Sequence, residues 1–464
     1  MTTAVVNPYL DGNFAPARSE ITASNLVVLG ELPADLCGVF VRNGPNPQFP
    51  PRGRYHWFDG DGMLHGVHIG NGTAQYRNRY VQTQGWKLEQ EAGSAIWTGL
   101  LSPPQPDNPY GPSKNTANTA LVWHSGRLLA LWEGGKPHEI KVPGLETVGP
   151  YTYGNQLKTA FTAHPKVDAV TGEMMFFGYS IAQPPYLHYS VVSAQGELLR
   201  TVPIDLPVGV MMHDFASTEH YTLFMDLPLT FRPERMQRGE SPLLFESDRP
   251  SRFGILPRHG DNSSIRWFEA APCYVFHTVN AYEEGEEVVL IACRMNGTTV
   301  LNASDNAGER NSDIPQMHRW RFNLSTGAVV EEQLDDIPSE FPSVNEQRLG
   351  RPTRYGYAAR TAPGSMPLFD GFIKYDLLTG SSQTHEFGSG RYGGEGVFVP
   401  RPGATAEDDG WLLTFVHDEV EGTSELVVLM AQDMTAEPVA RIMIPTRVPY
   451  GFHGTWITQA QLAG

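Results

Sequence analysis

A short turn recurs along this chain between stretches that have the character of β-strands. It is found as Asp168-Ala-Val-Thr-Gly172, Asn323-Leu-Ser-Thr-Gly327 and Asp376-Leu-Leu-Thr-Gly380, and Ala194-Gln-Gly-Glu197 occupies a similar place. Strand-like runs such as 317–322 and 371–375 precede it, and no regular helical pattern lies between the paired runs. A β-turn that repeatedly joins paired strands is typical of β-propeller blades, although this repeat is too degenerate to count the blades.

The rest of the chain supports an all-β fold. Residues 119–124 and 127–132 form a predicted hairpin around Ser125-Gly126, and further strands are expected at 396–399, 411–416, 426–430 and 440–444. The 47 glycines and 37 prolines indicate many turns rather than disorder. No linker divides the chain, so we predict one domain, 1–464, with an N-terminal arm over about 1–35. The strand rhythm breaks over 73–118 and again at about 226–250.

Charge and cysteine content limit the classes of partner. The formal net charge of -17 argues against nucleic acid and against a polybasic membrane surface. The three cysteines are widely spaced and odd in number, so free thiols in a reducing compartment are expected. The first residues show no basic segment followed by an apolar one, and no run approaches membrane-spanning length. We therefore expect a cytoplasmic location.

Four histidines follow apolar runs in distant parts of the chain, namely His164, His213, His277 and His453. Burying an imidazole without a partner is costly, and neutral imidazole suits Fe, Zn, Cu and Ni. The four rings would converge only if the chain wraps around an axis. Each histidine alone is equally explained as a core residue bonded to a backbone carbonyl. The chain has fifteen histidines, and the context of His188 is similar, so the residues alone do not select these four.

Three glutamates stand beside glycine or hydrophobic residues rather than in charged runs. They are Glu133 in Leu-Trp-Glu-Gly-Gly, Glu340 in Ser-Glu-Phe-Pro and Glu395 in Gly-Gly-Glu-Gly-Val. A metal-bound histidine usually donates its other ring N–H to a carboxylate or a carbonyl. The glutamates would suit that role, while each taken singly is also explained as a surface or turn carboxylate.

Other motifs in the sequence give less information about function. No Gly-x-Ser-x-Gly elbow or phosphate-binding glycine loop is present, and the glycine-rich stretch 388–394 is interpreted as a turn. Asp59 and Asp61 have calcium-loop spacing but lack the remaining EF-hand ligands, so two tight turns are expected there. For His56, His65 and His68 we expect surface or turn roles.

The chain resembles the carotenoid cleavage oxygenases, a non-haem iron family that includes stilbene-cleaving oxygenases and a retinoid isomerase. The resemblance covers nearly the whole chain and rests on motifs in a fixed order. They are Phe40-Val-Arg-Asn-Gly-Pro-Asn-Pro47, Phe58-Asp-Gly-Asp-Gly-Met63, Asn115-Thr-Ala-Asn-Thr119, Ala163-His164-Pro, Met212-His213-Asp-Phe, Phe276-His277-Thr-Val-Asn, Glu340-Phe-Pro and Phe452-His453-Gly-Thr-Trp.

The resemblance implies a seven-bladed β-propeller with one Fe(2+) per chain. By motif match, His164, His213, His277 and His453 would hold the iron, and Glu133, Glu340 and Glu395 would orient three of these ligands. A cap of loops and short helices, including 73–118 and 226–250, would cover the iron and form an apolar tunnel. The implied partners are a hydrophobic alkene and O2, with weak apolar membrane contact through the cap. The sequence does not indicate an oligomeric state.

The implied reaction splits one alkene bond with O2 into two carbonyl products, without external reductant, NAD or flavin. In the stilbene-cleaving branch a lysine that bonds the substrate phenol typically precedes the first glutamate, whereas this chain has Trp132. That difference favours an apocarotenoid or carotenoid substrate over stilbenoids or vinyl-phenols such as resveratrol, which remain the alternative. Trp132, Trp97, Phe58, Phe215 and Phe276 are candidate tunnel residues, each with an equally good explanation as core. A second alternative is a catalytically silent propeller that only binds a ligand.

Overall fold

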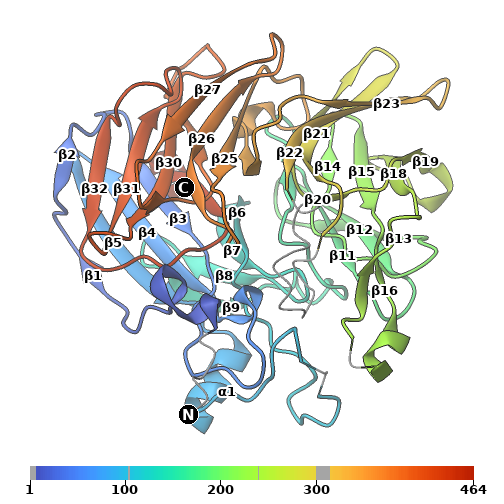
Figure 1. Cartoon of the computed structure of the whole chain (residues 1–464), viewed down its shortest axis with the longest axis horizontal. Coiled ribbons are helices and arrows are strands. Elements are labelled where there is room, and N and C mark those ends of the chain that lie inside the picture. Colours follow the sequence, from blue (N-terminus) through green and yellow to red (C-terminus); the bar gives the residue numbers. More distant parts are fainter. Residues whose placement is uncertain (1–6, 103–104, 239, 299–313, 464) are drawn as a thin grey trace. The chain divides into compact units, whose positions relative to one another are not determined.

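The computed structural model describes residues 7–102, 105–238, 240–298 and 314–463 (Figure 1). The chain divides into two compact units. Unit 1 comprises Met1–Thr152, Glu386–Gly403 and Gly410–Gly464, and unit 2 comprises Tyr153–His385 and Ala404–Asp409. Within the described residues, the regular structure is almost entirely antiparallel β-sheet.

Unit 1 holds three sheets. The first, in the order β1-β5-β4-β3-β33, consists of β1 (Thr22–Ala23), β3 (Gly38–Arg42), β4 (Met63–Gly70), β5 (Thr73–Tyr80) and β33 (Gly454–Thr458). The second follows chain order through β6 (Ala120–His124), β7 (Arg127–Leu131), β8 (His138–Lys141) and β9 (Glu146–Pro150). The third has the order β2-β32-β31-β30-β28, with β29 also on β30, and consists of β2 (Val28–Gly30), β28 (Arg391–Tyr392), β29 (Val397–Pro400), β30 (Gly410–Asp418), β31 (Thr423–Met430) and β32 (Ala440–Ile444).

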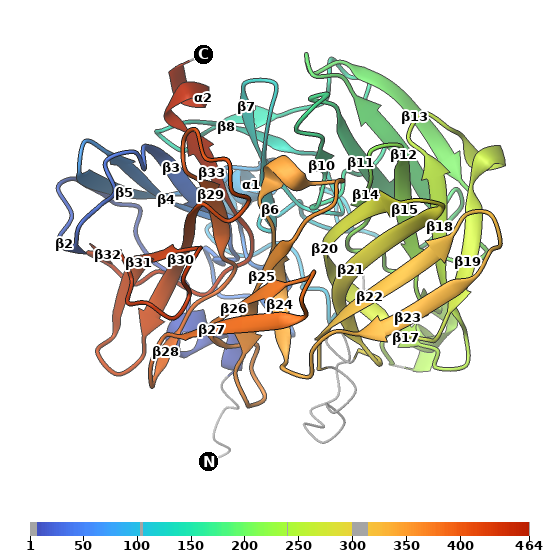
Figure 2. The ribbon, with the colours of Figure 1, turned by 90° about the horizontal axis from the view of Figure 1, so that it is seen from above.

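Unit 2 holds four four-stranded sheets and one small ribbon. The sheets are β10 (Lys166–Val167), β11 (Met174–Tyr179), β12 (Leu187–Val192) and β13 (Leu198–Ile204); then β14 (Ala216–Ser217), β15 (Tyr221–Asp226), β18 (Ser251–Pro257) and β19 (Arg266–Ala270); then β20 (Tyr274–Glu284), β21 (Glu287–Met295), β22 (Gln316–Asn323) and β23 (Val329–Gln333); and finally β24 (Ser339–Ser343), β25 (Tyr355–Thr361), β26 (Phe369–Asp376) and β27 (Ser381–Glu386). The ribbon pairs β16 (Leu229–Phe231) with β17 (Leu243–Phe245). Figure 2 shows β20 to β23 side by side.

Helices are short throughout the described residues. The α-helices are α1 (Gln84–Ala92) and α2 (Gln459–Ala463), and the 3-10 helices are η1 (Pro8–Leu10), η2 (Gly12–Phe14), η3 (Trp57–Asp59), η4 (Pro233–Arg238), η5 (Asn262–Ser264) and η7 (Glu346–Arg348). The seven larger sheets are the blades of a seven-bladed β-propeller, which confirms the predicted fold class. The last strand, β33, pairs with β3 from the start of the chain, so one blade of unit 1 joins both ends of the sequence.

Side-chain alternation explains why these segments form strands. In β22, His318, Trp320 and Phe322 are buried, and Arg319 and Arg321 between them lie on the more exposed face. Residues two apart share one face of a strand, so a single run supplies both core and surface. The arginines pair with acids on neighbouring strands, as Arg319 does with Glu332 at 2.6 Å. The predicted hairpin around Ser125-Gly126 is confirmed as β6 and β7.

The recurring turn has one conformation in all three predicted places. The side-chain oxygen of Asp168, Asn323 or Asp376 accepts hydrogen bonds from the backbone N–H groups two and three residues later. The glycine then donates its own N–H to the carbonyl of the first residue at 2.8 to 2.9 Å. Each of these glycines has φ between 70° and 79°, a region that an L-residue enters only with strain. Asp418-Glu-Val-Glu-Gly422 forms the same turn, which the sequence reading missed because threonine is absent.

The predicted arm and cap segments include strands of the blades. β1 and β2 from the arm add edge strands that pair with β5 and β32. The range 73–118 begins with β5, whose alternation was hidden because its inward face includes a polar residue, Asn78. Asn78 is buried and bonds to the backbone of Ser19 and Ile21, which satisfies its amide. The single domain 1–464 and the cap over the rest of 73–118 and 226–250 stay predictions.

Replacing the turn glycine Gly380 by alanine should lower the free energy of unfolding by about 1 kcal/mol, because φ is 74° there and the added Cβ meets no neighbour that could compensate. The matched control is Gly70→Ala, which also places its Cβ in open space but lacks the positive φ. Urea titration of both variants measures the difference. Equal stabilities for the two would show that backbone strain does not fix this turn.

Candidate metal centre

Three of the predicted ligands come together within unit 2. His164 lies just before β10, His213 lies just before β14, and His277 lies within β20, so each belongs to the first strand region of a different sheet. The Nε2 atom of His213 is 3.0 Å from Nε2 of His164 and 3.3 Å from Nε2 of His277. His213 and His277 are buried, and His164 is partly buried. Three of the four predicted ligand histidines therefore point to one place, and their role as metal ligands stays a prediction.

The donor set suits a metal ion. Nδ1 of His277 faces a carboxylate oxygen, so its proton belongs on Nδ1 and its Nε2 presents a lone pair. His213 Nε2 faces two other ring nitrogens and can donate at most one proton between them. Converging lone pairs of this kind, in a buried setting, are stabilised by a cation with nitrogen preference.

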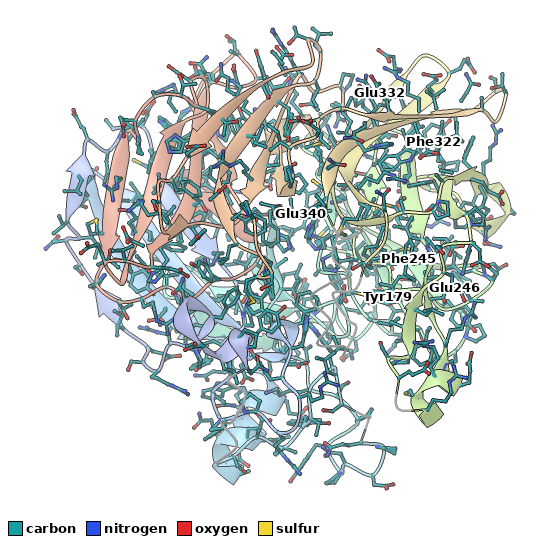
Figure 3. All side chains as sticks on the ribbon, in the orientation of Figure 1. Tyr179, Phe245, Glu246, Phe322, Glu332 and Glu340 are labelled. Carbon is teal, nitrogen blue, oxygen red and sulfur yellow. The ribbon has the colours of Figure 1, made fainter. Side chains whose placement is uncertain are left out.

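A glutamate holds the His277 ring from behind. Oε2 of Glu340 lies 2.6 Å from His277 Nδ1 and also accepts the backbone N–H of Phe341. Figure 3 labels Glu340, which comes from β24; its side chain is 12% exposed, against 54% for Glu332 on β23. Such a carboxylate fixes the tautomer and orientation of a ligand ring and makes its Nε2 more basic. The predicted role of Glu340 beside a ligand therefore has its geometry in place.

Local irregularities in two strands aim these groups. The pairing of β20 with β21 shifts between Val275 and Thr278, and His277 lies inside that shift. The pairing of β24 with β25 shifts between Glu340 and Ser343, and Phe341 has φ of 48°, unusual for a bulky residue. Bulges re-aim side chains and are common beside functional sites.

The fourth predicted ligand, His453, lies in unit 1 directly before β33. Its Nδ1 is 2.8 Å from Oε1 of Glu395, and Oε2 of the same glutamate accepts the N–H of Gly454 at 2.7 Å. The main chain of His453 is bonded to two other motifs of the sequence, because its carbonyl accepts from Asn43 N at 2.9 Å and its N–H donates to Thr119 at 3.2 Å. Glu395 thus holds His453 in the way that Glu340 holds His277.

A buried polar network that the sequence reading missed lies behind the unit 2 histidines. The Asp214 carboxylate, 1% exposed, receives Lys166 Nζ at 2.8 Å and both the N–H and the hydroxyl of Thr278 at 2.8 Å. Burial disfavours its charge, but Lys166 and these hydrogen bonds outweigh burial and lower the pKa of Asp214 below its ordinary value. The sequence does contain a sign of this network, because Lys166 and Asp214 have opposite charges and each follows a candidate histidine within two residues.

The aromatic candidates occupy varied positions. In unit 2, Phe276 contacts the His213 ring edge-on, with centroids 5.4 Å apart, whereas Phe215 is fully buried in a core cluster against Phe177 and Phe224. In unit 1, Phe58 packs edge-on at 5.6 Å against Phe452, the residue before His453. Trp97 is buried and donates its indole N–H to Gly111 at 2.9 Å. Their roles in a tunnel stay predictions.

Trp132 and Glu133 occupy a tight turn after β7. The indole of Trp132 lies so close to Gly134 that a Cβ there would come within 2.5 Å of it, so the glycine leaves room for the ring. Gly135 N–H closes the turn by donating to the Trp132 carbonyl at 3.1 Å. Glu133 is partly buried in this turn, and its proposed pairing with a ligand histidine stays a prediction.

The Asp59 and Asp61 carboxylates anchor the segment 84–114 rather than forming an EF-hand loop. Asp59 accepts the N–H of Leu100 at 2.7 Å, and Asp61 pairs with Lys114 at 2.9 Å. Glu89 of α1 pairs with the same Lys114 at 2.8 Å. A lysine thus provides the positive charge beside these acids. The two tight turns expected at the Asp-Gly pairs are wrong: the 3-10 helix η3 ends at Asp59, Gly60 is extended with φ of -65°, and Gly62 forms a β-bridge with Pro45.

Other buried histidines have neutral partners. His65 Nδ1 lies 2.8 Å from the Tyr76 hydroxyl, and His417 Nδ1 lies 2.9 Å from the Ser424 hydroxyl. His65 is 2% exposed within β4, so the surface or turn role expected for it is wrong; the strand β4 turns this ring inward beside a hydroxyl that satisfies it. Burial, with a smaller effect of Arg447, lowers the pKa of His417 to about 4.

The chain is similar to known proteins over nearly its whole length. The family model "Retinal pigment epithelial membrane protein" (RPE65) matches residues 14–458. Carotenoid 9,10(9',10')-cleavage dioxygenase 1 of Arabidopsis thaliana is 44% identical over 98% of this chain and 90% of its own length, and the carotenoid cleavage oxygenase of Mycobacterium tuberculosis is 36% identical over 98% and 99%.

Solved structures agree in fold. Pseudomonas brassicacearum lignostilbene dioxygenase has a TM-score of 0.89 at 32% identity, covering 97% of this chain and 98% of that chain. Cobalt-substituted Synechocystis ACO has a TM-score of 0.85 at 31% identity, covering 96% and 97%. The chain therefore belongs to the RPE65/carotenoid cleavage oxygenase family, which confirms the resemblance. It is a carotenoid oxygenase-type dioxygenase.

The cysteines and the helices bear on two further expectations from the sequence. The cysteines at 37, 273 and 293 are free, as predicted. Among the helices that the structure describes, none combines the length and apolar character needed to cross a membrane.

The stability of the protein should fall on acidification partly through His417. Its folded pKa is about 4 and its unfolded value about 6.5, so the unfolded chain binds more protons between these limits. The stabilisation is fully present above pH 6.5 and is lost as the pH falls toward 4. Urea unfolding at pH 7.5, 6.0 and 5.0 should show a shallower loss for His417→Gln than for the unmodified protein. Parallel pH profiles would contradict the assignment.

Replacing Glu340 by glutamine should weaken metal affinity by about 10–100-fold, because a neutral amide replaces the carboxylate that orients His277. Competition with a chromophoric chelator measures this affinity. The matched control is Glu331→Gln in the neighbouring sheet, whose carboxylate bonds to Trp320 and Ala271 instead of a ligand. An affinity for the Glu340 variant equal to that of the control would remove Glu340 from the site.

Proposed function

We propose that this chain is an Fe(II) dioxygenase that cleaves one carbon–carbon double bond of a carotenoid or apocarotenoid with O2. The alkene and O2 together give two carbonyl products, so the equation balances without a reductant. The observation that carries the proposal is the convergence of three ring nitrogens. Nε2 of His213 lies 3.0 Å from Nε2 of His164 and 3.3 Å from Nε2 of His277, and a carboxylate contacts the other nitrogen of the His277 ring.

The proposed ligands are His164, His213, His277 and His453, a group of residues that could hold a metal ion. The family resemblance of the four motifs supports including His453, as does its pairing with Glu395, which parallels that of His277 with Glu340. Glu133 is proposed as the third orienting carboxylate by motif match. Four neutral donors leave a bound Fe(II) cationic, and such an iron supplies the oxygen chemistry of alkene cleavage.

The chain's own residues contribute orientation and a dry surrounding. Glu340 and Glu395 accept the Nδ1 protons and so leave the Nε2 lone pairs of two rings available for the metal. Phe276 places an aromatic edge against the His213 ring and presents apolar surface next to the site. Such surface suits a hydrocarbon substrate better than a charged one.

Relatives and Trp132 support a polyene substrate. The Arabidopsis relative at 44% identity is named for cleavage of carotenoids at the 9,10 and 9',10' bonds, so we propose one of these bonds as the target here. Trp132 occupies the place of the phenol-binding lysine and packs over Gly134, so the turn is built around an indole rather than an ammonium group.

A second candidate is oxidative cleavage of stilbenoids to aromatic aldehydes. It is supported by the TM-score of 0.89 to a lignostilbene dioxygenase. Under this alternative another residue than Trp132 would anchor the phenol. A catalytically silent binding propeller is the remaining alternative, and the experiment below separates all three. The cytoplasmic location and the weak apolar membrane contact also stay predictions.

The decisive experiment follows absorbance with Fe(II)-loaded protein in air, offering an apocarotenal in detergent and resveratrol in parallel. We expect loss of the polyene band only when O2 is present, and mass spectrometry of the aldehydes locates the cleaved bond. Loss of the stilbene band alone would favour the second candidate. No change in either band with iron bound would overturn the substrate class, and a folded protein that takes up no iron would favour the silent propeller.

His213→Ala should abolish iron binding and turnover while the circular dichroism of the folded protein is retained, because His213 Nε2 lies between the other two ring nitrogens of unit 2. The matched control is His318→Ala, a buried histidine of the same unit that packs on Trp320. We expect that control to lose stability and keep its iron. Iron content by plasma emission measures both, and iron retained in the His213 variant would refute the ligand assignment.

A further inference from the structure

The three unit 2 histidines come from three different sheets, yet one carboxylate connects the chain next to all of them. Lys166 follows His164 by two residues, Asp214 follows His213 directly, and Thr278 follows His277 directly. Asp214 Oδ1 accepts Lys166 Nζ and the N–H of Phe215, each at 2.8 Å. Asp214 Oδ2 accepts the N–H and the hydroxyl of Thr278, each at 2.8 Å.

These bonds restrain the ligand backbones directly. Two of the four donors are main-chain N–H groups, of Phe215 and Thr278, so the carboxylate fixes peptide positions beside His213 and His277. The Lys166 ammonium group ties the His164 segment to the same point and lies 3.5 Å from the Thr278 hydroxyl. The ladder of β20 is irregular on both sides of Thr278, so regular strand pairing does not hold this stretch.

The hydrogen bonds of this network are strengthened by burial, and its two charges cancel. Asp214 is 1% exposed and Thr278 7% exposed, where hydrogen bonds to a charged group exceed ordinary ones in strength. Lys166 and Asp214 cancel in charge, so the network can position ligands without changing the net charge beside a bound cation. Because the four donors use both carboxylate oxygens, asparagine cannot reproduce the set: one side of its amide donates rather than accepts.

We propose that Asp214 is a positioning residue whose bonds to Lys166, Phe215 and Thr278 set the mutual spacing of the His164, His213 and His277 nitrogens before a metal binds. The proposal rests on the metal site proposed above. It assigns to this network the preorganisation of three ligands, while Glu340 and Glu395 orient individual rings. The affinity of the site for a metal is then limited by how well Asp214 holds three segments together.

The test uses the full-length protein stripped of metal and titrated with Co(II), whose visible absorption reports ligand geometry. Asp214→Asn should bind Co(II) about 10–100-fold more weakly and give a shifted and weakened band. The double variant Lys166→Met/Asp214→Asn should bind Co(II) no better than Asp214→Asn, because the tie between the His164 segment and position 214 stays absent. Full recovery of the band in the double variant would show that the unpaired ammonium group, and not the lost spacing, caused the defect.

The matched control is Asp226→Asn, a fully buried aspartate of the same unit that pairs with Arg249 and Arg252 away from the histidines. We expect it to lose stability and keep the Co(II) affinity and band. Thr278→Val is the milder variant: it removes one hydroxyl, should weaken Co(II) by a few fold, and carries the test if Asp214→Asn does not fold.

The outcomes separate this inference from the proposed function. Co(II) binding by the unmodified protein with an unchanged affinity and band in Asp214→Asn and Thr278→Val would overturn the positioning role alone. Failure of the unmodified protein to bind either Co(II) or Fe(II) would overturn the metal site, and this inference with it. Selective loss in the Asp214 and Thr278 variants, but not in the Asp226 control, would support the inference even if no substrate were cleaved.

Discussion

The structure of the site depends on holding imidazole nitrogens face to face. Nε2 atoms at 3.0 and 3.3 Å have at most one proton to share in each contact, and a ring whose Nδ1–H is donated to glutamate has none to give there. Left to itself, such a group would move apart or take up protons. The three rings stay together only if the surrounding structure holds them against the repulsion between their nitrogens. The glutamate carboxylates, the bulges and the buried Asp214 network all serve to hold them.

A propeller meets this requirement because each of the three unit 2 histidines lies beside or within the first strand of its own sheet. The first strands of neighbouring sheets contact one another, as β14 does with β20 and β20 with β24, so short irregular segments can be braced between rigid ladders. The bulges at His277 and at Glu340 release both residues from strict alternation, and the polar groups freed there are taken up by Asp214 and by Glu340 itself. Rigidity of the blades and local irregularity at their first strands are therefore complementary.

The sequence was informative where a pattern is local and less so where partners are distant. The hairpin at Ser125-Gly126 and the turns ending in Gly172, Gly327 and Gly380 follow from residues within five positions of each other. β5 escaped notice because its inward Asn78 satisfies its amide with the arm at Ser19 and Ile21, a partner that no local window contains. Family motifs, and not local context, pointed to the four proposed ligand histidines. Asp214 was passed over because its value lies in contacts with Lys166 and Thr278, which are 48 and 64 residues away in the chain.

The same contacts explain why burial alone cannot distinguish a ligand from a core histidine. His65 and His417 are as buried as His277 and His453, and all four use Nδ1 for a hydrogen bond. The difference lies in the partner, which is a neutral hydroxyl for the first two and a carboxylate for the other two. A hydroxyl satisfies the ring without adding a charge, whereas Glu340 and Glu395, only 12% and 14% exposed, bring in negative charge that needs a counter-charge. In the proposed metal site, a divalent cation on the Nε2 side would supply that charge, so the histidines and the glutamates would stabilise the same ion.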